Sequence, residues 1–333
     1  MPSTEIMTGK ERIKRAIEFS GPDRLPMEFP AVGDCDSEGF MWTRVIKHDP
    51  NGYERYDEWG CLWRTSNVQN IGYVAGHPLE NWDNFSSYQF PDPDNPAFFE
   101  GMEERAKNLD RNKYIKTHLQ YPLFDRLQML RGFENCMCDF YNEREKLEIL
   151  ADKLIDFDIK LAKNINSRFP DLIDGIRFAD DLGSELNSFI SIELFDEFYK
   201  PRYKKLFDVC HQFGWHVWFH SCGNVKNLVP SLIEAGVHVL NLQQPNVLGL
   251  EEFGKKFAGK VCFSTIADIQ QTLPSKDPVK IINEVKSLVK YWSTSAGGLI
   301  PQGYGNGAPI GTTEEALRVM YEAFKKYDLY SLN

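Results

Sequence analysis

The sequence predicts an α/β fold, a (β/α)8 TIM barrel with an irregular N-terminal insertion. From residue 113 onward, short apolar strands alternate with helical patterns, which is typical of a parallel sheet covered by helices. The length of 333 residues suits one such barrel as a single domain over residues 1–333. No glycine-rich phosphate loop follows the first strand, and this disfavours the open, dinucleotide-binding alternative.

The N-terminal part begins with a helix and continues into the insertion. Thr8 followed by Glu11 forms a capping box, and Gly21 with its following proline ends the helix. A short strand is expected over 25–29. The insertion, residues 30–110, is rich in aromatic residues, glycine and proline, so we expect turns and exposed loops there. Long insertions of this kind usually serve a site, and we interpret it as a lid over the mouth.

The remaining chain supplies the repeating units of the barrel. Pro201 falls inside a helical pattern and predicts a kink or break there. Seven strands can be counted, and an eighth is expected within residues 70–75. The other strands are expected over 25–29, 114–118, 176–179, 217–219, 237–242, 261–264 and 299–300, and the helices after the insertion over 123–131, 147–169, 191–213, 225–235, 250–257, 279–292 and 314–327.

Composition excludes several classes of partner. The formal charge is −10 and Lys and Arg form no dense run, whereas nucleic acid and anionic membranes are bound by clustered cations. No apolar stretch reaches the about 18 residues of a membrane span, and the N-terminus has no apolar signal core. Seven scattered cysteines argue against a disulfide framework. We expect a cytoplasmic protein that binds neither nucleic acid nor membrane.

Polar residues follow five successive strands. In a barrel, the carboxyl ends of all strands meet at one rim, where catalytic groups collect. One such group could be a helix cap, but five in register indicate a functional rim. The polar segments are Asp180-Asp181, His220–Asn224, Asn241 with Gln243 and Gln244, Ser264–Asp268, and Gln302–Asn306, which includes Tyr304.

His220 and Cys222 are two residues apart, so on an extended segment they point the same way. One imidazole and one thiolate at a common point are half of a zinc site. The third ligand is left open: Cys262 is the best remaining thiolate, and several rim residues offer oxygens. The alternative is a buried histidine and cysteine, each satisfied locally. The oxygen donors are Asp180, Asp181, Glu185 and Tyr304.

The adjacent carboxylates of Asp180 and Asp181 offer general acid–base chemistry as a second possibility. When two carboxylates lie close together, the pKa of one is raised, so that one of them can act as a proton donor near neutral pH. Neighbours on a strand face opposite ways, so only one is expected to enter the site. Asp180 could also simply cap a following helix.

At these residues the sequence resembles the uroporphyrinogen decarboxylase superfamily, whose fold is the (β/α)8 barrel. The superfamily contains the porphyrin decarboxylase and corrinoid-linked methyltransferases that take methyl groups from methylamines, methanol or aryl methyl ethers. The resemblance covers most of the chain. It is carried by Thr8–Ala16, Arg24–Pro26, Asp57–Arg64, His77–Trp82, Asp180–Gly183, Pro201, His220–Asn224, Leu242–Pro245, Phe263–Gln270, Leu273-Pro274 and Gly297–Ile300.

Two departures bear on the branch of the superfamily. The decarboxylase carries an arginine-rich motif on its N-terminal strand, whereas Met27–Asp34 has no arginine and contains Glu28. The resemblance therefore favours the methyltransferase branch, in which a His-x-Cys pair and a distant cysteine hold zinc. His220 and Cys222 match that pair. Gln302–Asn306 stands where the distant cysteine would fall.

The resemblance implies a zinc-assisted methyltransferase that moves a methyl group between a small methylated donor and a corrinoid (methylcobalamin) on a partner protein. Alternatives are a decarboxylase-type lyase acting on a carboxylated ring, and a non-catalytic corrinoid or porphyrin binder, although the corrinoid motif Asp-x-His-x-x-Gly is missing. A homodimer is left open. The expected residues are Asp180, Asp181 and Tyr304 for catalysis, Asn241, Gln243 and Asp268 for cofactor binding, and His220, Cys222 and Cys262 for the metal.

Overall fold

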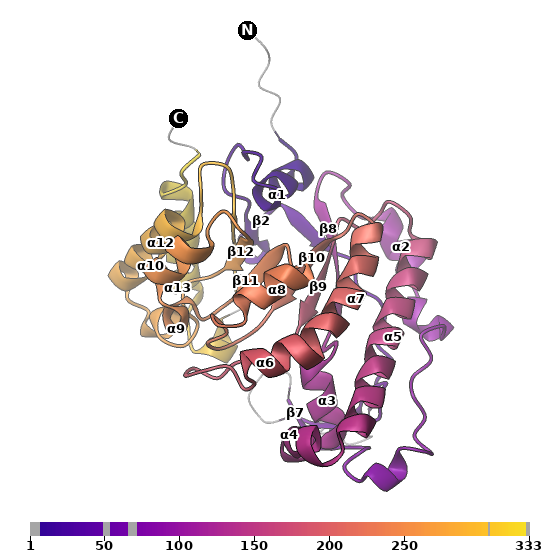
Figure 1. The fold of residues 1–333 in the computed structure, drawn as a ribbon. Coiled ribbons are helices and arrows are strands. Elements are labelled where there is room, and N and C mark those ends of the chain that lie inside the picture. The colour runs from indigo at the N-terminus through magenta and orange to yellow at the C-terminus, as the bar shows by residue number, and fades with distance from the viewer. Residues whose placement is uncertain (1–6, 49–53, 66–71, 306, 331–333) are drawn as a thin grey trace.

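The centre of the computed structural model is a curled sheet of seven parallel strands (Figure 1). The structure describes residues 7–48, 54–65, 72–305 and 307–330. The strands are β3 (Ser37–Gly39), β8 (Tyr114–Gln120), β9 (Gly175–Ala179), β10 (His216–His220), β11 (Val239–Leu242), β12 (Cys262–Thr265) and β13 (Leu299–Pro301). They lie in the order β13-β12-β11-β10-β9-β8-β3, and every adjacent pair is parallel. Strand ends that follow one another in the chain are therefore neighbours in space.

A short hairpin lies between the two edges of this sheet. Its strands are β1 (Glu28–Phe29) and β2 (Asp34–Cys35), which pair antiparallel. Glu28 makes a single parallel bridge to Gln302, just beyond β13, while β2 leads into β3 at the other edge. The predicted α/β fold is confirmed as a curled parallel sheet with helices after most of its strands, but among the described residues this sheet has seven strands and its edges β13 and β3 are not paired with each other.

Helices follow most strands and contact one another in chain order, α3 with α5, α7 with α8, and α12 with α13. Figure 1 shows α5, α7 and α8 side by side over the strands. None of the described helices is long and apolar enough to cross a membrane. The helices are α3 (Phe124–Arg131), α4 (Phe133–Asn142), α5 (Arg144–Arg168), α6 (Ile192–Leu194), α7 (Lys200–Gln212), α8 (Val229–Ala235), α9 (Pro245–Leu248), α10 (Leu250–Phe257), α11 (Thr272–Ser275), α12 (Pro278–Trp292) and α13 (Glu314–Lys326), with a 3-10 turn at Ala308–Ile310.

The irregularity predicted at Pro201, a kink or a break, is present as a π-helical turn within a continuous helical segment. Pro201 lies in the first turn of α7, and a π-helical turn, Phe195–Tyr199, separates α7 from α6. Proline lacks an N–H and cannot continue the regular α-helical hydrogen-bond ladder, so the turn before it adopts the wider π-helical form.

The first helix, α1 (Gly9–Ile17), covers the amino-terminal ends of the strands. One half of the predicted capping box is confirmed, because the Thr8 hydroxyl accepts a hydrogen bond from the Glu11 amide at 3.1 Å, whereas the Glu11 carboxylate pairs with Arg15. The buried face of α1 belongs to a separate apolar cluster inside the sheet, so this end of the sheet is plugged. The cluster contains Ile13, Ala16, Ile17, Tyr114, Trp218, Val239, Cys262 and Ile300.

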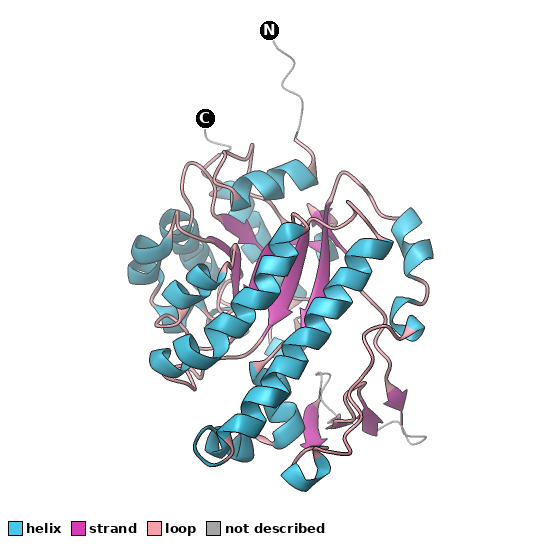
Figure 2. Cartoon of the chain, turned by 45° about the vertical axis from the view of Figure 1, so that its right-hand side comes forward, coloured by secondary structure: helices cyan, strands magenta, loops and turns pink. Residues whose placement is uncertain are grey.

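The insertion is more regular than predicted. It holds a four-stranded antiparallel sheet, and Figure 2 shows the small strands near the end to which the arrowheads of the parallel strands point. The eighth barrel strand expected within 70–75 is wrong: residues 70 and 71 lie outside the described residues, and the strand at Tyr73–Gly76 pairs antiparallel with β6. β3, inside the insertion, joins the main sheet instead. The other elements are β4 (Lys47–His48), β5 (Glu54–Tyr56), β6 (Leu62–Arg64), β7 (Tyr73–Gly76), α2 (Met102–Lys107) and 3-10 turns at Pro30–Val32, Trp82–Asn84 and Pro96–Phe99.

A buried ion pair joins the insertion to α3. The Asp57 carboxylate lies 2.8 Å from Arg126 and also accepts hydrogen bonds from Trp63 Nε1 and from the Trp59 and Cys61 amides. Burial alone would raise the pKa of Asp57, but Arg126 and these donors hold it below its ordinary value. Because both charges are desolvated and each has a partner, the contact fixes the small sheet against the main body.

Candidate functional site: a histidine–cysteine–aspartate cluster

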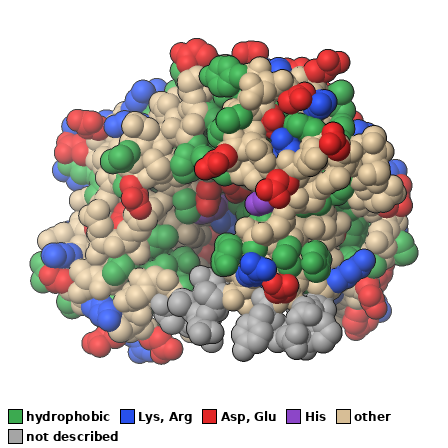
Figure 3. Space-filling view, turned by 90° about the horizontal axis from the view of Figure 1, so that it is seen from below, with side chains coloured by type: hydrophobic (Ala, Val, Ile, Leu, Met, Phe, Trp, Pro, Cys, Tyr) green, Lys and Arg blue, Asp and Glu red, His purple; other side chains and the backbone are tan. Residues whose placement is uncertain are grey.

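The polar segments predicted from the sequence do meet at the carboxyl ends of neighbouring strands. β9, β10, β11, β12 and β13 are consecutive in the sheet, and each is followed by one of these segments. Seen from below, the molecule is hollowed near the middle of this face, where acidic, basic and histidine side chains come together (Figure 3).

His220 is the last residue of β10 and its imidazole is held in one orientation. Its Nδ1 atom lies 3.0 Å from the backbone oxygen and 2.9 Å from the side-chain oxygen of Asn241. The Asn241 oxygen also accepts a hydrogen bond from Arg177, and its Nδ2 donates to Ser264, so the amide orientation is defined. Both neighbours of Nδ1 are acceptors, so Nδ1 carries the proton and Nε2 keeps its lone pair.

Cys222 is presented by a tight turn after β10. Gly223 has a φ of 78°, and a Cβ built there would lie 2.2 Å from the backbone oxygen of Gly183. The Gly223 amide donates to the side-chain oxygen of Gln244. Only glycine fits this conformation and this close approach, and the turn brings Cys222 Sγ to 3.6 Å from His220 Nε2.

Asp181 completes the group from the loop after β9. One of its oxygens lies 3.7 Å from His220 Nε2 and accepts a hydrogen bond from the Cys222 amide at 2.9 Å. Its own amide donates to Asp125 on α3. The Asp181 side chain is half exposed, whereas that of His220 is only 12% exposed, so the group opens to solvent on the aspartate side.

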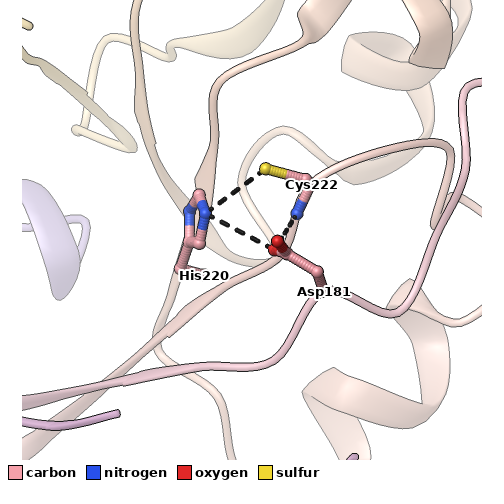
Figure 4. A group of neighbouring side chains, drawn as sticks. All are labelled: Asp181, His220 and Cys222. Atoms are coloured by element: carbon pink, nitrogen blue, oxygen red, sulfur yellow. Dashed lines mark hydrogen bonds and ion pairs between the residues drawn. The ribbon is translucent and has the colours of Figure 1, made fainter. Parts of the chain in front are cut away.

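These three residues, the rim cluster, fit a zinc ion. Their nitrogen, sulfur and oxygen atoms lie within 4.8 Å of one another (Figure 4), and no other such group of His, Cys, Asp or Glu occurs among the described residues. For tetrahedral zinc, with bonds of about 2.0 to 2.3 Å, ligand atoms lie about 3.4 to 3.6 Å apart. The Nε2–Sγ distance of 3.6 Å and the Nε2–Oδ1 distance of 3.7 Å are close to these values.

The charge states suit a cation as well. Burial, with Arg177 adding to it, lowers the pKa of His220 to about 4, so the imidazole is neutral at neutral pH, as a metal ligand must be. Burial and the Asp181 carboxylate raise the pKa of the Cys222 thiol. A thiol of this kind ionises when a bound metal replaces its proton.

Cys262, expected as a third ligand, is not brought to the rim cluster. It begins β12 and is completely buried in the apolar cluster beneath α1. In register it faces Val239, whereas the level of His220 on β10 is matched by Asn241 and then Ser264. The Cys262 thiol therefore lies two residues closer to the amino-terminal ends of the strands than His220 does. Asp181, and not Cys262, is the third residue of the rim cluster.

Asp180 is completely buried and its carboxylate is fully engaged. It accepts hydrogen bonds from the amides of Leu123, Phe124 and Asp125 at the start of α3, and from the Tyr203 hydroxyl at 2.6 Å. Burial raises the pKa of Asp180 to about 6, although these hydrogen bonds lower it. Asp180 thus caps a helix, the structural alternative considered for it, and points away from the rim cluster.

The other predicted residues are divided between the site and its supports. Asn241 contacts His220 directly. Gln243 binds the Ile269 amide through its backbone oxygen, and Asp268, buried, accepts from the Gln270, Gln271 and Asn246 amides, so these two shape neighbouring loops. Tyr304 is partly buried, and its pKa is raised by burial and by the nearby Cys222. Asn306, in the same loop, lies outside the described residues.

Sequence reasoning missed a cavity of about 700 Å³, called the interior cavity below, which opens to solvent past Pro30 and Asp110 and extends inward to Asn241. Three basic side chains on the inner faces of β8 and β9 line it, together with Asn241, which also holds His220. A charged residue within an otherwise apolar strand, as in Ile176-Arg177-Phe178, is the signal that could have found it. The basic residues are Lys116, His118 and Arg177.

Asp125 was also missed. It is part of α3 and accepts the Asp181 amide. Burial, with the carboxylates of Asp180 and Asp181, raises the pKa of Asp125 well above its ordinary value. Its position depends on Asp180 capping the same helix, a contact between segments 55 residues apart in the chain, and no local pattern indicates it.

Comparison with known proteins agrees with this fold. A sequence model of the uroporphyrinogen decarboxylase family matches residues 73–327. Among solved structures, a methyltransferase from Methanosarcina mazei superimposes with a TM-score of 0.69 at 16% identity, over 96% of this chain and 99% of that one. A family 10 endo-β-1,4-xylanase from Gloeophyllum trabeum gives 0.44 at 10% identity, over 72% and 83%.

No curated protein matches the chain significantly by sequence. At 16% identity, the likeness to the Methanosarcina mazei methyltransferase describes the fold alone. The family match covers well over half of the chain, and the chain therefore belongs to the uroporphyrinogen decarboxylase family.

Proposed function

We propose that this protein is a zinc-assisted methyltransferase that moves a methyl group between a small methylated donor and a corrinoid on a partner protein. The observation that carries the proposal is the convergence of His220 Nε2, Cys222 Sγ and an Asp181 oxygen within 4.8 Å at the rim. Three protein ligands that leave one position open are the pattern of a catalytic rather than a structural zinc site. The match to the family and the likeness to a methyltransferase fold are consistent with it.

When bound, zinc would act as a Lewis acid on the heteroatom that carries the methyl group. In the transfer, the methyl group would leave without its bonding electrons and the corrinoid cobalt would supply the electron pair. The donor heteroatom keeps the old bonding pair and then takes up a proton. The second substrate, the corrinoid, would have to approach the open side of the rim cluster, where Asp181 is half exposed.

The side chains around the rim cluster would keep its atoms in place. Asn241 fixes the imidazole of His220 through Nδ1, a contact that both orients a ligand and increases its basicity. Two hydrogen bonds position Asp181. Its carboxylate accepts one from the Cys222 amide, and its own amide donates one to the Asp125 carboxylate. We assign Asp180 a positioning role, because its carboxylate joins the loop after β9 to α3.

The insertion would act as the lid. Its small sheet lies at the carboxyl end of the strands (Figure 2) and is anchored by the ion pair between Asp57 and Arg126. We also propose that the seven-stranded sheet closes into an eight-stranded barrel, in which β1 is the strand between β13 and β3. The Gly303 amide donates to the Glu28 backbone oxygen at 2.8 Å, which supports this arrangement.

The test is methyl transfer to reduced cobalamin, followed by its absorption spectrum, with methylamines, methanol and methoxybenzenes as donors. Wild type loaded with zinc is expected to methylate the cobalamin with at least one donor, and His220→Ala and Cys222→Ser to lose this activity. Cys138→Ser, a change at an exposed cysteine outside the site, is the matched control. Loss of carbon dioxide from a carboxylated ring without any methyl transfer would support the lyase alternative and overturn the proposal.

A further inference from the structure

Arg177 is a mostly buried cation without an ionic partner. It lies on the inner face of β9 and lines the interior cavity. Its one hydrogen bond among the described residues is from Nη2 to the Asn241 side-chain oxygen, at 2.9 Å. No described carboxylate lies within the 4.0 Å of a salt bridge to it, in contrast to Arg12, Arg126 and Arg131.

The other charged side chains that line the cavity make no ion pair with Arg177. The Glu28 carboxylate forms an ion pair with Lys116 at 2.5 Å and accepts a hydrogen bond from the Ser37 hydroxyl. Lys116 also lies 4.0 Å from the centre of the Trp218 ring. At the outer part of the cavity, the Glu38 carboxylate accepts the Asp110 amide. Arg177 therefore lacks a direct ion-pair partner at the inner wall, although the lining as a whole carries three carboxylates (Glu28, Glu38 and Asp110) against three cations (Lys113, Lys116 and Arg177).

Two further groups beside Arg177 can interact with an anion. Gln302 Nε2 is buried and has no hydrogen-bond partner among the described residues, and Gln302 lines the same cavity. His118 lies directly beside Arg177 in the register of β8 and β9. Burial, with Arg177 and Lys116 adding to it, lowers the pKa of His118 to about 3, so a neutral imidazole with one N–H faces the cavity.

A buried guanidinium with most of its donors unused is costly unless a ligand pairs with it. The planar fork of the guanidinium matches the two oxygens of a carboxylate, which it binds through two parallel hydrogen bonds. The volume of about 700 Å³ is large enough for a small organic acid. An apolar or cationic donor would leave Arg177 and Gln302 unpaired.

We propose that the interior cavity binds the carboxylate of the methyl donor, with Arg177 as its ion-pair partner and Gln302 as a second donor. This deepens the proposed function, on which it rests, by naming the substrate class: a methylated small molecule that also carries a carboxylate. Asn241 Oδ1 lies 2.9 Å from both Arg177 Nη2 and His220 Nδ1. The carboxylate at Arg177 and the methyl-bearing heteroatom at the rim cluster would thus belong to one compact molecule.

The test measures binding by isothermal titration calorimetry, and so does not depend on turnover. Acetate, benzoate and 4-methoxybenzoate are each compared with the neutral amide of the same shape. At least one acid is expected to bind about tenfold or more tightly than its amide, since hydrogen bonds between two charged groups are stronger than those between neutral groups. Wild-type protein that binds no acid more tightly than its amide overturns the inference.

Variants locate the effect. Arg177→Met is expected to remove the preference for the acid, and Arg177→Lys to retain part of it because the charge stays but the fork is lost. Arg202→Met is the matched control, since Arg202 pairs with Asp152 on the helical surface, and it is expected to bind acid and amide as wild type does. A folded Arg177→Met protein that keeps the full preference for the acid contradicts the assignment.

The inference and the proposed function can fail separately. Selective binding of an acid that depends on Arg177, without methyl transfer from any methylated acid, supports the carboxylate site and counts against the reaction. Methyl transfer from 4-methoxybenzoate and 4-methoxybenzamide with equal kcat/KM supports the reaction and overturns the carboxylate site.

Discussion

His220 Nδ1 lies 2.9 Å from the side-chain oxygen of Asn241 and 3.0 Å from its backbone oxygen. This contact assigns the proton to Nδ1 and leaves Nε2 free to face Cys222 and Asp181. Asn241→Leu is therefore expected to weaken zinc binding about 10- to 100-fold, as losses of such supporting contacts do. Competition with a chromogenic chelator measures the affinity.

Ser264→Ala is the control for this prediction. It removes a partner of the Asn241 amide nitrogen but leaves both oxygen contacts of His220 in place, so zinc affinity is expected to stay close to that of wild type. Equal affinity in Asn241→Leu and wild type would show that the imidazole needs no such support.

Gly223→Ala is expected to destabilise the fold and to disturb the turn that presents Cys222. The new Cβ would lie 2.2 Å from the Gly183 oxygen, in addition to the strain of a φ of 78°. Gly249→Ala is a matched control, because Gly249 has a φ of 79° but no atom within 4 Å of the added carbon. Strain alone should cost about 1 kcal/mol, so urea unfolding is expected to show a clearly larger loss for Gly223→Ala. Similar losses in both would mean that the close approach to Gly183 has no energetic weight.

The ion pair between Asp57 and Arg126 is expected to hold the insertion in place. Arg126→Met leaves the Asp57 carboxylate buried without its cation and should cost about 3 to 5 kcal/mol. Arg64→Met removes an exposed partner of Glu54 and should cost less than about 1 kcal/mol. Thermal unfolding, together with limited proteolysis within the insertion, distinguishes the two variants. Wild-type protease resistance in Arg126→Met would exclude the anchoring role.

A partly buried histidine near the amino-terminal end of the sheet, His238, predicts a pH dependence of stability. Burial, with neighbouring His216 and His211 adding to it, lowers the pKa of His238 to about 4, and its Nδ1 accepts the Val217 amide. In the unfolded chain the value is about 6.5. Between these values the unfolded chain binds a proton that the folded chain does not, so stability falls as pH falls from about 6.5 to about 4.

His238→Asn keeps an acceptor for the Val217 amide but does not titrate. Its free energy of unfolding should fall less steeply with decreasing pH, by up to about 1.4 kcal/mol per pH unit. Urea unfolding of both proteins at several pH values measures the difference in slope. The comparison isolates this histidine, since burial raises the pKa of acids such as Asp158, which act in the opposite direction. Parallel slopes would contradict the prediction.

The sequence predicted the order of strands and helices after the insertion because their apolar patterns are local. The strands at β9, β10 and β12 and the helices α10 and α12 fall within a few residues of their expected bounds. The insertion was harder to predict, since its strands are only two to four residues long, too short for an alternating pattern. β3 joins the main sheet by pairing with β8, a contact distant in sequence.

The site was predictable only where it depends on residues close in sequence or on neighbouring strand ends. The approach of His220 and Cys222 follows from their spacing, and their meeting with Asp181 follows from adjacent parallel strand ends. The choice of Asp181 rather than Asp180 depends on which carboxylate caps α3, and this requires the position of that helix. Cys262 is buried because α1 packs over the amino-terminal ends of the strands, and α1 is far from β12 in the sequence.

We propose that Asp181, His220 and Cys222 together hold one metal ion. Loading the protein with Co²⁺ and recording the thiolate-to-cobalt charge-transfer band tests this metal site most directly. We expect this band, with one bound metal per chain, in wild type and in Cys262→Ala, its loss in Cys222→Ser, and weaker metal binding in Asp181→Asn. A wild-type protein that binds no metal, or a band lost in Cys262→Ala and retained in Cys222→Ser, would contradict the assignment.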